Sequence, residues 1–381
     1  MNTFKLALTT SITLLLSACG STPKAKIEYP SQQTNQQAVS TNPSEMQVAK
    51  SAFAFNDADI QVPAYFDTQG LKYCTFERNN EDERCPLKKP TIRVYFDKNT
   101  VQAEKAEQQA LAAVNNQQIE LMLENMVAGL NRFRIITQDD KTIQQEIEKQ
   151  LANNAAATAQ KLSTNRAINP DYILKVDTLK TADRFYGEYN GVAQYFLEMT
   201  ASVLDPFTQE KLASPNIGKI RVESKEVRSH DELVFTEVSG RYYTGFNYQD
   251  QQNVQAVMSD MASRGLSVMV TRLLSELPAS GEVMGIKGNQ ISIDRGQNAG
   301  ILPKETMIVF VYEAGFVDPI GVAEVNPSKT SANGRIVQWK NSKLAQKIQQ
   351  QSNDGIFRPN SNQKIYVVSV GAPQEYVDNR L

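Results

Sequence analysis

The sequence predicts an α+β protein in which a helix-backed mixed sheet is followed by a small β-barrel. Between residues 91 and 278, alternating apolar runs are separated by long helix-forming stretches. After Pro278 the pattern changes to short strands and glycine turns. Hydrophobic residues make up 41% of the chain and charged residues 22%, which is ordinary for folded proteins. This composition excludes wholesale disorder and a multi-span membrane protein.

The chain opens with a segment that has the pattern of a secretory signal. Lys5 precedes an uncharged run of 11 residues, from Leu6 to Leu16. A helix needs about 20 apolar residues to cross a bilayer, so this run is too short to span one. We therefore expect residues 1–18 to be a signal peptide.

The end of this segment, Leu16-Ser17-Ala18-Cys19, resembles the lipobox of bacterial lipoproteins. The resemblance implies cleavage between Ala18 and Cys19 and attachment of three acyl chains at Cys19. Gly20 follows the cysteine where inner-membrane lipoproteins carry Asp, which implies an outer-membrane protein, lipid-anchored and facing the periplasm. The alternative is an ordinary signal peptide whose cysteine is incidental.

Two segments separate this signal from the predicted sheet. Residues 19–50 are predicted to be a disordered tether, because Ser, Thr, Gln, Asn and Pro dominate up to about Glu45. Residues 51–90 form a lead-in segment with the other two cysteines, Cys74 and Cys85, which enclose ten mostly polar residues. We expect a disulfide, which adds roughly 2 to 3 kcal/mol for a loop of this size. A metal site is not expected, because the single histidine, His230, lies far away in sequence.

The region 91–278 is predicted to contain strands and helices in mixed order. Alternation predicts a strand at 91–96, with Ile92, Val94 and Phe96 on one face. A helix over 101–130, a short strand at 133–136, a polar helix over 142–162, a buried strand at 171–176 and an alternating run at 195–204 follow. The amphipathic helix 253–277 carries a methionine stripe, for which we favour the core over a partner groove.

The region 279–381 is predicted to be the β-barrel. Gly288-Asn289 lies between two alternating apolar runs and predicts a hairpin turn. Residues 294–300 are expected to form a loop, and 307–312 and 364–370 to form strands.

Two family resemblances follow from these segments. The order of strand, long helix, GLNRFRII, Gln/Glu-rich helix and PDYIL resembles the curli-secretion lipoprotein superfamily over about 91–277. Its relatives include lipoprotein activators of peptidoglycan synthases. The carboxy-terminal region resembles the SH3-like domain of the flagellar T-ring protein, through its GNQISIDRGQNAGI segment. Members of that flagellar family carry a plain secretory signal, so the lipid cysteine is a departure from it.

The sequence contains no pattern that predicts catalysis or a cofactor. It lacks a nucleophile elbow, a phosphate-binding loop and a zinc-helix motif. The acid pairs Asp57/Asp59 and Asp139/Asp140 are typical of turns, and Gly296 and Gly300 precede no helix that would bind phosphate. Basic runs are short and the net charge is -2, which argues against nucleic acid. We predict a non-enzyme without cofactor, metal or small-molecule substrate.

Three functions fit these expectations. The first is a scaffold or accessory ring component of a flagellar or secretory envelope assembly, whose partners are the outer membrane and other envelope proteins, with a ring-forming homo-oligomer as one form. The second is a subunit of a curli-type secretion channel, for which 218–230 and 232–248 are the best hairpin candidates although both carry many charges. The third is a periplasmic activator of a peptidoglycan synthase.

Overall fold

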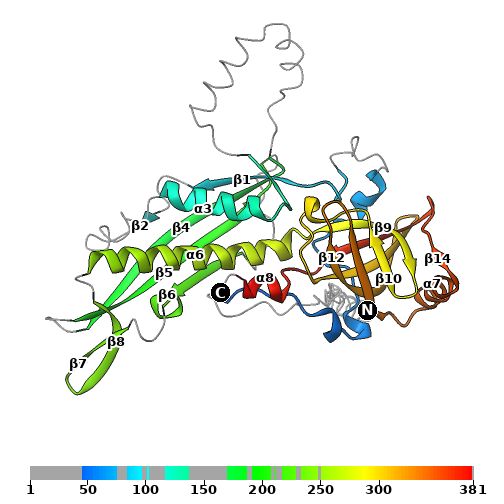
Figure 1. Ribbon diagram of the computed structural model, residues 1–381. Coiled ribbons are helices and arrows are strands. Elements are labelled where there is room, and N and C mark those ends of the chain that lie inside the picture. The colour runs from blue at the N-terminus through cyan, green and yellow to red at the C-terminus, as the bar shows by residue number, and fades with distance from the viewer. Residues whose placement is uncertain are drawn as a thin grey trace, which may run out of the picture. The chain divides into compact units, whose positions relative to one another are not determined.

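The computed structural model describes residues 45–74, 84–96, 101–102, 116–136, 170–186, 191–206, 211, 217–228, 233–247 and 250–379. Contacts group residues 37–381 into one compact unit, and a second unit, 1–36, lies wholly outside the described residues. The fold is broadly α+β, as predicted, with a curled mixed sheet and a closed barrel (Figure 1).

The first sheet contains eight strands. These strands are β1 (Thr91–Phe96), β2 (Val101–Gln102), β3 (Arg134–Ile135), β4 (Tyr172–Tyr186), β5 (Val192–Leu204), β6 (Lys219–Glu223), β7 (Val234–Val238) and β8 (Arg241–Asn247). The main order is β3-β1-β4-β5-β8-β7, while β2 pairs with β4 and β6 with β5. Because β1 is parallel to β3 and β4, and β5 is antiparallel to its neighbours, the sheet is mixed.

Two helices cover one face of this sheet, namely α3 (Asn116–Gly129) and α6 (Gln251–Glu276) (Figure 1). Alternation along β1 turns Ile92 and Val94 toward them, and both side chains are completely buried. The methionine stripe of α6 lies in the same core, which confirms the core interpretation. Asp250 caps α6 by accepting a hydrogen bond from the Asn253 amide at 3.1 Å.

The barrel closes through six strands in the order β9-β10-β13-β12-β11-β15 and back to β9. The strands are β9 (Ser280–Lys287), β10 (Gln290–Ile293), β11 (Glu305–Glu313), β12 (Phe316–Pro327), β13 (Ala332–Trp339) and β15 (Gln363–Ser369). The predicted turn at Gly288-Asn289 joins β9 to β10, with Gly288 at a φ of 57°. Helix α7 (Lys343–Asp354) and the short strand β14 (Ile356–Phe357) follow β13, and α8 (Gln374–Asp378) ends the described chain.

Some predicted elements differ from the structure. The helix predicted over 101–130 is described only from Asn116 to Gly129, and its first two residues instead form β2 beside β4. A backbone hydrogen-bond partner on β4 outweighs the helix propensity of Val101 and Gln102. The polar helix predicted over 142–162 lies outside the described residues.

Candidate functional site: the strap, its disulfide and the exposed hairpin

Residues 46–74 and 84–90 form a strap that contacts both the α/β region and the barrel. Met46 lies in the core beneath α6, and the Gln47 amide donates a hydrogen bond to the Thr271 hydroxyl at 3.1 Å. Packing therefore begins inside the range 19–50 that the sequence predicts as tether, while residues 19–44 lie outside the described part. A single methionine in a polar stretch does not predict from the sequence that the chain is packed at this point.

The rest of the strap covers an apolar face on the outside of the barrel. The buried strap side chains are Ala52, Phe55, Ile60, Phe66, Leu71, Cys85 and Leu87, and the barrel side chains beneath them include Ile308, Phe310, Val322, Tyr366 and Val368. Phe66 meets Phe310 edge-to-face, with ring centroids 6.0 Å apart. Without the strap, this barrel face would expose a continuous apolar patch, so the strap is part of the fold.

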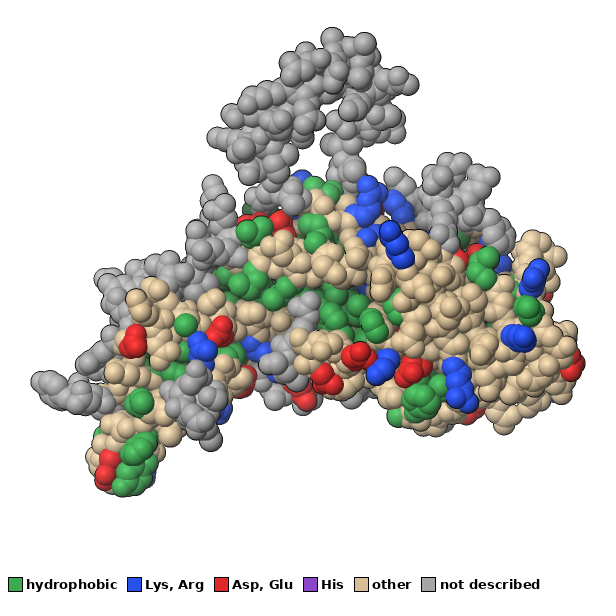
Figure 2. Space-filling view, in the orientation of Figure 1, with side chains coloured by type: hydrophobic (Ala, Val, Ile, Leu, Met, Phe, Trp, Pro, Cys, Tyr) green, Lys and Arg blue, Asp and Glu red, His purple; other side chains and the backbone are tan. Residues whose placement is uncertain are grey.

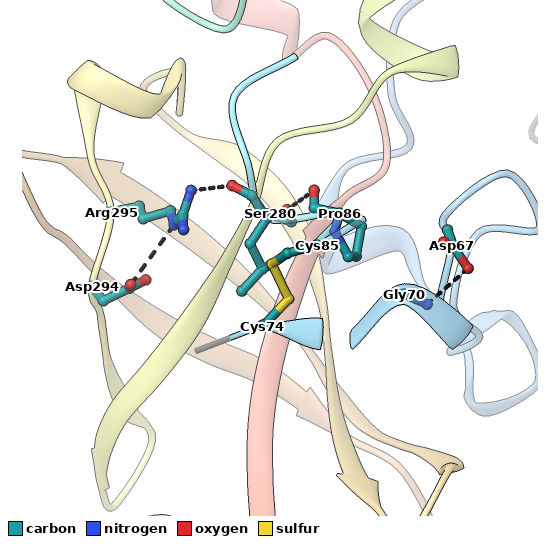
Figure 3. Close-up of a disulfide and its surroundings, with 9 residues drawn as sticks. Asp67, Gly70, Cys74, Cys85, Pro86, Ser280, Asp294 and Arg295 are labelled. Carbon is teal, nitrogen blue, oxygen red and sulfur yellow. Dashed lines mark hydrogen bonds and ion pairs between the residues drawn. A yellow bond between two sulfur atoms is a disulfide. The ribbon is translucent and has the colours of Figure 1, made fainter. Parts of the chain in front are cut away.

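The predicted disulfide joins Cys74 to Cys85 within the strap (Figure 3). Their Cα atoms are 4.9 Å apart, and Cys85 is only 3% exposed. The enclosed residues 75–83 lie outside the described part of the chain. The bridge holds the middle of the strap to its end, which reduces the freedom of the unfolded chain.

Polar contacts fasten the same stretch to the barrel (Figure 3). The Arg295 guanidinium donates to the Leu87 carbonyl and lies 3.7 Å from the Asp294 carboxylate. The Ser280 hydroxyl donates to the Pro86 carbonyl at 3.5 Å. These contacts fix the point at which the strap leaves the barrel and enters β1.

A buried ion pair joins the α/β region to the barrel. Arg132, 2% exposed, follows α3, and its Nη2 donates to Oε1 of the completely buried Glu305 at 2.6 Å. The carboxylate also accepts hydrogen bonds from the Leu302 amide, at 2.7 Å, and from the Ser369 hydroxyl. Three further guanidinium donors bond to the carbonyl oxygens of Gly300 and Leu274. Both buried charges are thus paired with each other and held by additional hydrogen bonds.

The glycines considered for phosphate binding form a turn at this junction. Gly300 has a φ of 73°, and a Cβ there would lie 2.3 Å from the Arg132 Cα. A Cβ on Gly296 would lie 2.2 Å from the Ser328 carbonyl oxygen. Both positions require glycine for close backbone approach, which agrees with the turn interpretation.

The hairpin formed by β7 and β8 extends away from the rest of its sheet (Figure 1). Ser239 and Gly240, with φ of 54° and 74°, form the tight turn. Phe235 is 71% exposed and Tyr242 70% exposed, and their rings pack edge-to-face with centroids 6.3 Å apart. Figure 2 shows the resulting apolar surface on the hairpin. Two aromatic rings this exposed form a candidate contact surface.

The acid pair Asp57/Asp59 lies on the strap and takes part in hydrogen bonds. Asp59 caps a short turn through Asn56 and pairs with Lys50, whose hydrogen bond lowers the pKa of the Asp59 carboxyl. The Asp57 carboxylate accepts from the Asn341 amide. The lipid and cleavage residues Cys19 and Ala18 and the pair Asp139/Asp140 lie outside the described residues. Within the described ranges, no three His, Cys, Asp or Glu side chains gather in a way that could hold a metal ion.

No protein-family model matches the chain, and no curated protein matches it either. Among the described helices, none combines the length and apolar character needed to cross a membrane.

Sequence reasoning missed the ion pair and the strap contacts. Arg132 and Glu305 are 173 residues apart, and nothing local distinguishes them from surface charges. The sequence does predict the exposed hairpin, because Ser239-Gly240 separates two alternating runs that contain aromatic residues.

Proposed function

We propose that the protein is an outer-membrane-anchored lipoprotein that faces the periplasm and acts as a non-enzymatic scaffold or accessory ring component of a cell-envelope assembly. The observation that carries the proposal is Leu16-Ser17-Ala18-Cys19 at the end of a charged and then apolar leader. An anchor of three acyl chains holds such a protein at the membrane in practice permanently. The part of the predicted tether 19–50 that precedes Met46 then links this anchor to the packed strap.

The exposed hairpin supports action through protein contacts. Its rings at Phe235 and Tyr242 bury little area within the chain, while aromatic side chains contribute strongly to binding when a partner covers them. Val234, 46% exposed, lies next to Phe235 on β7, the outermost strand of the sheet. A flagellar or secretory component that covers this strand gains both edge hydrogen bonds and aromatic burial.

We infer that residues 91–278 are related to the curli-secretion lipoprotein superfamily, and that the barrel is SH3-like as in the flagellar T-ring protein. The succession of β1, α3, β3 and β4, with α6 across the sheet, supports the first relation. The turns at Gly288-Asn289 and 294–300 support the second.

Photo-cross-linking in intact cells tests the scaffold function. A photoreactive amino acid at Phe235 is expected to capture a discrete envelope protein, and Phe235→Ser with Tyr242→Ser is expected to abolish co-purification of that protein. Phe53, 69% exposed on the strap, gives the matched control, because Phe53→Ser removes an equally exposed ring elsewhere. If the hairpin and control variants retain the same partners, the hairpin is not the contact surface.

A curli-type channel subunit is the second candidate, favoured by the hairpin of β7 and β8, Val234–Asn247, which lies within the candidate segment 232–248. In the other candidate segment, 218–230, the described residues 218–228 form β6 and a short turn at Ser224–Glu226. Glu237 and Arg241 also place charges on β7 and β8. Rings in negative-stain images together with ion conductance in planar bilayers would select the channel over the scaffold.

A peptidoglycan-synthase activator is the third candidate, and unchanged synthase activity after deletion of the gene would exclude it.

A further inference from the structure

Four cations lie on the segments that meet where the strap enters the sheet, Lys88, Lys89, Arg93 and Arg134, and we call them the basic patch. Lys88 and Lys89 end the strap, Arg93 lies on β1 and Arg134 on β3. Figure 2 shows Lys and Arg side chains together beside the position of β1.

Strand register places Arg93 and Arg134 on one face of the sheet. Thr91 is directly opposite Arg134 in the parallel β1–β3 pair, and the Arg134 amide donates to the Pro90 carbonyl at 2.8 Å. Arg93 lies two positions beyond Thr91, roughly 7 Å along the strand, and points away from the buried Ile92 and Val94. Lys89 is close enough to Arg134 for the two charges to repel, which, after burial, is a cause of the lowered pKa of Lys89.

The basic patch differs from the other charges on the outer face of the same sheet. Those on β5, β6 and the following turn form a ladder of ion pairs: Lys219–Glu198 at 3.1 Å, Arg221–Glu198 at 3.6 Å, Arg221–Glu223 at 3.8 Å and Lys225–Glu223 at 2.8 Å. By contrast, no member of the basic patch forms an ion pair with a described residue. Asp171, beside the start of β1, accepts a hydrogen bond from the Thr91 amide at 2.6 Å.

One member is also left unsatisfied within the sheet. Arg93 Nε is buried and has no hydrogen-bond partner. An anionic ligand at this face would reduce the repulsion between these cations and accept charge-assisted hydrogen bonds from their exposed donors. Tyr95, 42% exposed, lies two residues beyond Arg93 on the same face and adds an amphipathic ring.

We propose that the basic patch binds the phosphate groups of an anionic membrane surface and orients the folded part against it. This inference rests on the proposed lipid anchor for its choice of partner. A leash of roughly 25 residues reaches at most about 80 Å, which keeps the folded part close to the lipid headgroups. At the resulting high effective concentration, a few cations with weak individual attraction suffice to set the orientation. An acidic protein segment has no such tether to this chain.

Vesicle co-sedimentation of the unlipidated chain tests the patch independently of the anchor. The chain from residue 20 onward retains the whole compact unit 37–381. It is mixed at low salt with vesicles of phosphatidylcholine containing 30 mol% phosphatidylglycerol, roughly the anionic content that gives a clear surface potential. The variant combines Lys88→Gln, Lys89→Gln and Arg134→Gln. The matched control combines Lys329→Gln, Lys343→Gln and Lys347→Gln, which removes the same charge from exposed barrel positions.

The expected result is binding to anionic but not to pure phosphatidylcholine vesicles, with loss in high salt. The patch variant is expected to partition about 100-fold more weakly, at about fivefold per cation, while the control changes little. Equal losses in variant and control, or no binding of the wild-type chain, would overturn the proposal. Capture of an acidic protein by the patch without vesicle binding would overturn it as well. The result is independent of whether Cys19 is lipidated, so failure of the patch and failure of the anchor are distinguishable.

Discussion

The buried Arg132–Glu305 ion pair predicts how the two folded regions depend on each other. Arg132→Met removes the guanidinium and leaves the completely buried Glu305 carboxylate with the Leu302 amide and the Ser369 hydroxyl as its remaining donors. Breaking a buried pair in this way costs about 3–5 kcal/mol of unfolding free energy, because an uncompensated charge stays buried.

The matched variants separate the pair from simple loss of packing. Glu305→Gln keeps an acceptor for the Leu302 amide but leaves the Arg132 charge to two carbonyl oxygens, and we expect a loss of about 2–4 kcal/mol. Combining Glu305→Gln with Arg132→Met is expected to cost about 2 kcal/mol less than the sum of the single changes, since neither charge is then unpaired.

Chemical denaturation provides the assay. The single tryptophan, Trp339, lies on β13 and reports on the barrel, whereas far-ultraviolet circular dichroism reports on both regions. We expect coincident transitions in the wild-type protein and separate transitions in Arg132→Met. A loss below about 1 kcal/mol, with transitions that still coincide, would refute the role of the pair in joining the regions.

Three further predictions concern the strap and its surroundings. Cys74→Ser is expected to lower the unfolding free energy by about 2–3 kcal/mol, and a reductant should lower the melting temperature of the wild type but not of this variant. Gly300→Ala, which places a Cβ against Arg132, should destabilise by more than about 2 kcal/mol, whereas Gly315→Ala, with φ of 91° and open space, should cost only about 1 kcal/mol. Burial raises the pKa of Tyr366, so the folded state holds this proton more tightly and stability falls as pH rises above about 10. Its buried hydroxyl has no hydrogen-bond partner, so Tyr366→Phe should keep or raise stability and weaken that alkaline loss; a large destabilisation would contradict this.

Local patterns predicted those elements whose side chains alternate or repeat with a clear period. Strand β1 and helix α6 were predicted to within a few residues, because their apolar faces coincide with the core. The turn at Gly288-Asn289 followed from its residue types. The disulfide followed from the cysteine count, with Cys19 assigned to the lipid, and from the polar loop between Cys74 and Cys85.

Features that depend on distant contacts had no comparable signal. The described part of the strap contains three short 3-10 helices, Ala52–Ala54, Asp57–Asp59 and Gln69–Tyr73, and no regular period. Its burial depends on an apolar barrel face that lies more than 200 residues away in the chain. For the same reason the basic patch was missed, since Lys89 meets Arg134 only through the parallel pairing of β1 with β3.

Membrane fractionation of the wild-type protein and of Cys19→Ala, expressed in a Gram-negative host, tests the proposed anchor most directly. The account predicts that wild-type protein sediments with the outer membrane and is released only by detergent, and that Cys19→Ala is found in the soluble periplasmic fraction. Because the basic patch alone binds weakly, washing both membrane samples in high salt removes its contribution. Cys19→Ala protein that still sediments with the outer membrane after this wash would contradict the account.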